Sequence, residues 1–129
     1  MAAFVLSGCD QSNEEIKERI IDSDSVAINY FRGDGNLDTV VAVKIIRDSG
    51  KIAQLAQFIS AGPSSKKQNC GYDGSIHFFK MSKVIQDVNF RMNQANCMHF
   101  SFFQNGNFKT SELSTEAKAL LDSISKQEQ

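Results

Sequence analysis

Two hydrophobic periods alternate along this chain, and together they predict an α+β fold. Apolar residues recur with period two over 25–32, 39–46 and three short runs between Cys70 and Phe108, as in strands with one buried face. Helical spacing appears instead at 49–61 and 114–124. Hairpins followed by one-sided helices imply an antiparallel sheet. We therefore predict an antiparallel sheet of about five to six strands, with a helix inserted after the first hairpin and a C-terminal helix packed on it.

Turn and cap residues separate these segments. Asp48 can cap the first of the two helices, and Gly62-Pro63 ends it. Asn105-Gly106 is a strong hairpin-turn signal. Near the N-terminus, 12–15 has the form of a capping box, which predicts a further short helix ending near Ile21.

Some central strands carry apolar side chains on both faces. Phe79 and Met81 alternate with apolar neighbours that belong to the opposite face, and Phe103 does the same in a later strand. A sheet with one solvated face would alternate more cleanly. Two explanations stay open: the first or the C-terminal helix covers the second face, or these three side chains form an exposed binding face for a partner or an apolar ligand.

Composition narrows the class without naming an activity. A chain of 129 residues with 41% hydrophobic and 22% charged residues is typical of one folded domain. A net charge of -1 provides no long-range field that would attract nucleic acid. We therefore expect no nucleic-acid partner.

The apolar N-terminal run ends in Leu6-Ser7-Gly8-Cys9, followed by polar residues. This resembles the lipobox of bacterial lipoproteins, which implies a lipid on Cys9 and removal of the residues before it. Few residues precede Cys9 and none is Lys or Arg, whereas an export signal needs a positive region and a longer apolar stretch. We therefore expect Met1 to be an internal start that lacks the front of the signal. The alternative is an apolar N-terminal strand that contains a cysteine by chance.

Two cysteines remain once Cys9 is set aside, and their interpretation depends on export. In an exported protein, Cys70 and Cys97 favour a disulfide. The bond requires their Cα atoms to come within about 7 Å.

A metal site is the alternative use of these residues. Cys97 and His99 would share one face of a strand, and His77 could join them by parity. Cys70 would complete a tetrahedral Cys/His set. The chain has no CxxC pair and no HExxH helix, so the spacing matches no common zinc module.

No catalytic constellation is visible in the sequence. Catalysis by a Cys–His pair needs a base within hydrogen-bond reach and an oxyanion hole, and neither is indicated. No pair of carboxylates is placed for acid–base work. We expect no cofactor and no enzymatic activity.

The run Cys70-Gly-Tyr-Asp-Gly74, the later Cys97 and the closing Leu113-Ser-Thr-Glu-Ala-Lys resemble small uncharacterised secreted or lipid-anchored proteins of Bacteroidetes-type bacteria. The resemblance covers roughly the last sixty residues. It implies export and paired cysteines, and it transfers no activity, ligand or catalytic residue. The element order is also reminiscent of cystatin-like inhibitors and β-lactamase-inhibitor-protein repeats, at the level of fold alone.

These observations define an expected organisation. Residues 1–9 are the remnant of a lipoprotein signal, 10–23 a polar tether with a possible short helix, 24–126 a single α+β domain and 127–129 a frayed tail. We expect a lipid-anchored protein of the bacterial cell envelope, on the periplasmic side or the cell surface. Its disulfide-stapled domain would bind an envelope protein or an apolar ligand without catalysis. The alternative is a metal-binding or Cys/His-dependent protein that uses Cys70, His77, Cys97 and His99.

Overall fold

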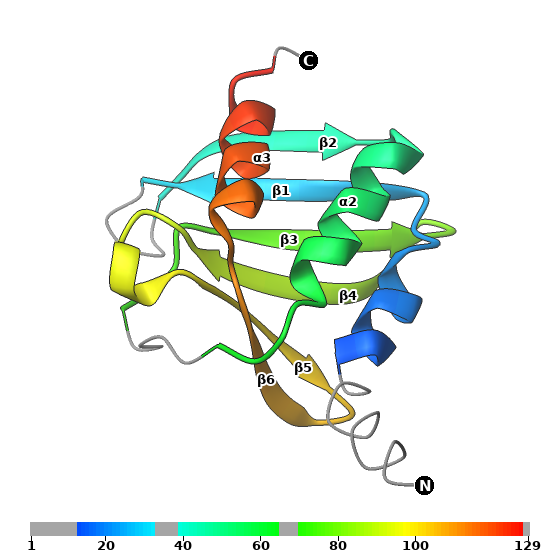
Figure 1. The fold of residues 1–129 in the computed structure, drawn as a ribbon. Helices are drawn as coiled ribbons and strands as arrows, with labels where there is room; N and C mark the ends of the chain where they lie inside the picture. Colours follow the sequence, from blue (N-terminus) through cyan, green and yellow to red (C-terminus); the bar gives the residue numbers. More distant parts are fainter. Residues whose placement is uncertain (1–12, 33–38, 65–69, 128–129) are drawn as a thin grey trace, which may run out of the picture.

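One antiparallel sheet organises the chain, as the computed structural model of residues 13–32, 39–64 and 70–127 shows (Figure 1). Its six strands lie in the order β2-β1-β3-β4-β5-β6. The elements are β1 (Ser25–Phe31), β2 (Val40–Ile46), α2 (Ser49–Ile59), β3 (Gly74–Lys80), β4 (Lys83–Arg91), the short 3₁₀ helix η1 (Ala95–Cys97), β5 (His99–Gln104), β6 (Asn107–Glu112) and α3 (Thr115–Ser125). The predicted α+β class is confirmed, including the helix after the first hairpin and the C-terminal helix.

Three α-helical segments of the described chain pack on the same face of the sheet (Figure 1). They are α2, α3 and the helical segment 13–20. In β1 the residues of one parity face them, and their side chains are buried. The core joins these strand positions to the apolar stripes of the helices, represented by Ile16, Ile20, Val26, Ile28, Leu55, Ile59, Ile76, Phe78, Phe90, Phe100, Leu121 and Ile124.

Local chemistry fixes the helix starts where the sequence predicts them. The Asp48 carboxylate accepts from the amides of Gly50 and Lys51 at the start of α2. The Ser114 hydroxyl accepts from the amide of Ala117 at the start of α3. Each cap satisfies backbone donors that have no partner within the first helical turn.

Two hairpins close with residues of positive φ. Asn105 and Gly106 join β5 to β6 at φ of 53° and 81°, which confirms the predicted turn. Met81 and Ser82 join β3 to β4 at 52° and 66°, a region that costs energy for residues with a Cβ. The Asp24 carboxylate accepts from the amide of Met81 at 2.8 Å and holds this turn.

The position of Cys97 differs from the expectation. It lies in η1, and β5 begins only at His99, so Cys97 and His99 do not share a strand face. The cause is Asp73, whose carboxylate accepts from the amides of Met92 and Asn93 at 2.7 and 2.8 Å. These donors are therefore turned away from the ladder, and the chain leaves the sheet after β4.

Candidate functional site

The second face of the sheet, here called the open face, carries no helix from the described part of the chain. Exposed apolar side chains form two groups on this face. Val41 and Val43 lie on β2, and Val84, Phe103 and Phe108 lie on β4, β5 and β6. The explanation in which the first or the C-terminal helix covers this face is therefore wrong, because both pack on the opposite face.

A hollow of about 340 Å³ lies on the open face over β4, β5 and β6. Its apolar wall includes Val84, Phe103 and Phe108. The rings of Phe103 and Phe108 meet edge to face with centroids 5.5 Å apart, and they remain 63% and 50% exposed. Its polar wall includes Gln86, Asp87, Asn89 and Ser101. The hollow therefore offers apolar contact on one side and hydrogen bonding on the other.

A hydrogen-bonded chain of side chains begins at the polar wall and crosses to β1. His77 Nδ1 lies 2.6 Å from Asp87 Oδ1, and His77 Nε2 lies 3.0 Å from Ser75 Oγ. Since a carboxylate only accepts, Nδ1 carries the proton, and Nε2 of the neutral ring is then an acceptor within reach of both the Ser75 hydroxyl and the Asn29 amide. Asn29 Nδ2 lies 3.3 Å from Ser75 Oγ and 3.2 Å from His77 Nε2. We call Asn29, Ser75, His77 and Asp87 the polar relay.

The register of the sheet positions the polar relay. Asn29 pairs with Ser75, and His77 pairs with Asp87. The pairs at the β3–β4 turn, Lys80 with Lys83 and Phe79 with Val84, would place Gln86 opposite His77 if the ladder continued regularly. A register shift between Phe78 and Phe79 brings Asp87 there instead.

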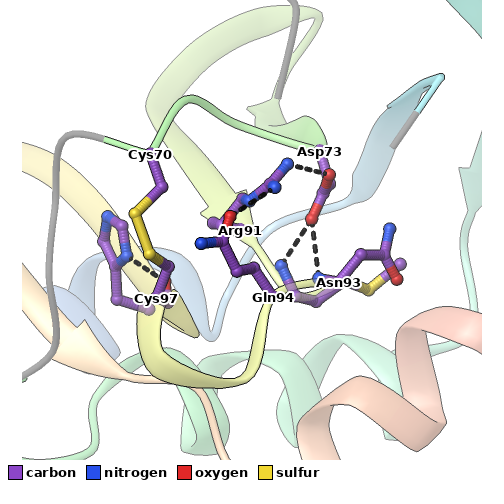
Figure 2. The surroundings of a disulfide bond; sticks show 8 residues. Cys70, Asp73, Arg91, Asn93, Gln94 and Cys97 are labelled. Atoms are coloured by element: carbon purple, nitrogen blue, oxygen red, sulfur yellow. Dashed lines mark hydrogen bonds and ion pairs between the residues drawn. A yellow bond between two sulfur atoms is a disulfide. The ribbon is translucent and has the colours of Figure 1, made fainter. Parts of the chain in front are cut away.

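The disulfide lies at the end of the sheet where β3 begins and β4 ends (Figure 2). Cys70 and Cys97 are bonded with their Cα atoms 6.4 Å apart, which confirms the predicted disulfide. Beside them, Arg91 Nη1 donates to Asp73 Oδ1 at 2.7 Å, and Arg91 Nη2 donates to Gln94 Oε1 at 2.9 Å. These contacts are structural, because Asp73 is nearly fully buried and its carboxylate accepts three hydrogen bonds.

The predicted binding-face residues occupy different places. Phe103 lines the hollow. Phe79 is half-buried on the open face, where it pairs with Ser25 and Val84, and it does not line the hollow. Met81 is 79% exposed in the β3–β4 turn. That these side chains bind a partner stays a prediction.

The alternative metal set does not assemble. Its two cysteines are joined to each other, and His77 is held by the polar relay. His99 is fully buried, and its Nδ1 donates to the carbonyl of Cys97 at 2.6 Å. Among the described residues, no group of at least three His, Cys, Asp or Glu side chains could hold a metal ion.

Sequence reasoning missed Ser75 and Asp87 as partners of His77. The parity of Ser75 and His77 in one strand was a usable signal, because residues two apart share a face. The position of Asp87 was not readable, because it depends on the register shift in β3 and β4.

Comparison with known proteins adds no relative. No family model, no curated protein and no solved structure matches this chain. Within the described residues, no helix is long and apolar enough to cross a membrane. Cys9 and the run 6–9 that resembles a lipobox lie outside the described residues.

Proposed function

We propose that this chain is an exported, lipid-anchored domain that binds an amphiphilic small molecule in the hollow of its open face. The observation that carries the proposal is the composition of the hollow, with an aromatic and aliphatic wall opposite Asp87, Asn89 and Ser101. Ligand sites are typically concave, mainly apolar and furnished with a few polar groups that orient the ligand. The volume of about 340 Å³ suits a small ligand or one end of a larger one.

Export is supported by two independent features. The Cys70–Cys97 disulfide is typical of proteins from oxidising compartments. The Leu6-Ser7-Gly8-Cys9 run resembles a lipobox. A lipid on Cys9 would anchor the domain at the bacterial cell envelope.

The tether favours an amphiphile as the ligand. Only four residue steps separate Cys9 from Asn13, where the described helical segment begins, and they span at most roughly 14 Å. Glu15 in that segment accepts from Asn105 Nδ2 in the β5–β6 turn at 3.1 Å. Phe103 and Phe108 flank this turn. With Cys9 lipidated, the apolar wall of the hollow would lie close to the membrane, where amphiphiles concentrate.

Titration with the neutral fluorophore N-phenyl-1-naphthylamine tests the binding site. We expect saturable binding to the wild-type domain, weakened roughly tenfold or more in Phe103→Ser because a large apolar contact is lost. Val43→Ser is the matched control, since Val43 is also exposed on the open face but lies on β2, away from the hollow. Binding that does not saturate, or an equal loss in both variants, would contradict the proposal.

Intact mass tests the anchor separately. The protein is expressed in a bacterial host from its natural gene and measured before and after reduction and alkylation. We expect a lipid adduct on Cys9 and two further thiols that react only after reduction. An unprocessed N-terminus with three reactive thiols would contradict export.

A further inference from the structure

We propose that the polar relay is an acyl-transfer centre, in which Ser75 is the nucleophile for esters whose apolar acyl group occupies the hollow. This inference goes beyond ligand binding, and it rests on the proposed function for the seating of the acyl group. It also departs from the expectation that the chain has no catalytic constellation.

The geometry of the polar relay matches the requirements of an activated serine. Nucleophile and base must lie within hydrogen-bond reach, and a third group must orient the base. Ser75 Oγ and His77 Nε2 are 3.0 Å apart, and Asp87 Oδ1 lies 2.6 Å from the other ring nitrogen. Asp87 therefore fixes the tautomer in which the lone pair of Nε2 faces the serine.

Burial separates the nucleophile from the bulk solvent while leaving the base accessible. Ser75 is 8% exposed, whereas the His77 side chain is 29% exposed and the Asp87 side chain 67%. Nε2 is contacted by Ser75 Oγ and Asn29 Nδ2, so a leaving group or a water molecule approaches it once the Asn29 amide has turned toward the oxyanion.

The hollow lies one strand away from the nucleophile. Asn89 and Asp87 line it, and they pair with Ser75 and His77. Neighbouring strands are about 4.8 Å apart, so Phe103 on β5 and Phe108 on β6 lie roughly 10 and 14 Å from β3, and only an acyl chain of about ten carbons against them can place its carbonyl over β3. Amide donors flank that position, Asn29 on β1 and Asn89 on β4. Asn29 Nδ2, at 3.3 Å from Ser75 Oγ, is the oxyanion donor.

The reaction balances with water as the only co-reactant. Ser75 Oγ bonds to the ester carbonyl carbon while its proton passes to His77 Nε2, and the Asn29 amide donates to the resulting oxyanion. The carbon–oxygen bond to the alcohol breaks, and the leaving alkoxide takes the proton from Nε2. Water then attacks the acyl-serine, its proton passes through Nε2 to Ser75 Oγ, and the carboxylic acid leaves. Asp87 is a positioning residue, because it acts through His77.

An alkyl fluorophosphonate tests the nucleophile in the wild-type chain. Ser75 Oγ would bond to phosphorus, fluoride would leave and His77 would take the proton. We expect one adduct, mapped to Ser75 by peptide mass spectrometry, with the labelling rate reduced roughly 10²–10⁴-fold in His77→Ala. Ser25→Ala is the matched control, because Ser25 lies on β1 outside the polar relay. An adduct elsewhere, no adduct, or labelling that survives His77→Ala would overturn the proposal.

Hydrolysis of p-nitrophenyl decanoate tests the role of Asp87. We expect Asp87→Asn to lower kcat with little change in KM, and Asp87→Glu to restore part of kcat. Equal rates in Asp87→Asn and wild type would contradict the positioning role. Failure here is distinguishable from failure of the proposed function: if N-phenyl-1-naphthylamine binds and Ser75 is inert, only the acyl-transfer proposal is wrong.

Discussion

Gly74 lies in β3, between β1 and β4, at a position where the neighbouring atoms leave no room for a side chain. A Cβ built on Gly74 would lie 2.3 Å from Phe90 Cζ and 2.4 Å from the carbonyl oxygen of Asn29. The second atom belongs to the backbone of a paired strand and cannot rotate away. Glycine is therefore required by close packing.

We expect Gly74→Ala to lower the free energy of unfolding by roughly 1–3 kcal/mol or more, as overpacking does. Gly62→Ala is the matched control, because nothing lies within 4 Å of a Cβ at Gly62. Its effect should stay below about 1 kcal/mol. Urea denaturation of both variants measures the difference, and equal midpoints would contradict this account of Gly74.

Tyr30 makes the free energy of unfolding depend on pH in the alkaline range. Burial raises the pKa of its hydroxyl above the usual value, the Asp122 carboxylate adds to the rise, and the hydroxyl donates to the carbonyl of Leu121 at 2.7 Å. Because the folded pKa exceeds the unfolded value near 10, the contribution is complete below about pH 10 and is lost as pH rises above it.

Above pH 10, unfolding should therefore become easier by up to about 1.4 kcal/mol per pH unit through Tyr30 alone. Tyr30→Phe should be less stable at neutral pH, since it leaves the Leu121 carbonyl without this donor, yet it should decline less steeply above pH 10. Urea unfolding at pH 8 and at higher pH measures both. Parallel declines in the variant and the wild type would show that Tyr30 is not the source.

At the scale of elements, the β3–β4 hairpin combines two unusual features. Its turn uses Met81 and Ser82 at positive φ, without the glycine or asparagine that such turns favour. Its ladder shifts register between Phe78 and Phe79, which places Asp87 opposite His77. Asp24 stabilises this strained turn, because its carboxylate accepts a hydrogen bond from the amide of Met81.

Ser82→Gly should raise the free energy of unfolding by roughly 0.5–1 kcal/mol, because glycine removes the left-handed penalty at some cost in unfolded-chain entropy. The matched control is Ser123→Gly within α3, where glycine should be destabilising by about 0.5 kcal/mol. Thermal and urea unfolding of both variants gives the comparison. A loss of stability in Ser82→Gly would contradict the strain at this turn.

Local chemistry explains which elements the sequence predicted. The stripe of α3, the cap at Asp48 and the Asn105-Gly106 turn depend on neighbouring residues, and all three were readable. The pairing of β1 with β3 and the turn that contains Cys97 were not, because they depend on contacts between residues far apart in the chain. The polar relay falls between these cases. The shared strand face of Ser75 and His77 was readable, and the cross-strand partner Asp87 was not.

At the scale of the whole molecule, the disulfide restrains a long connection. Cys70 and Cys97 are 27 positions apart, and the intervening segment includes β3 and β4. Under the chain-entropy model, closing such a loop stabilises the folded state by about 3.5 kcal/mol.

The double variant Cys70→Ser/Cys97→Ser should therefore unfold at lower urea concentration, with a loss near that value. Cys9→Ser is the control, because Cys9 takes no part in the bond. Denaturation of the wild type with and without a reductant checks the same quantity. A wild-type midpoint that ignores the reductant would contradict a stabilising bond.

The two faces of the sheet carry different features. One buries the core under the helices, and the other presents the hollow and the polar relay. The most direct test of a ligand site on the open face is an NMR titration of the wild-type domain with N-phenyl-1-naphthylamine. We predict shift changes confined to residues around Val84, Asp87, Phe103 and Phe108, with the α2 and α3 signals unmoved. Changes centred on the helices, or no saturable change, would contradict a ligand site on the open face.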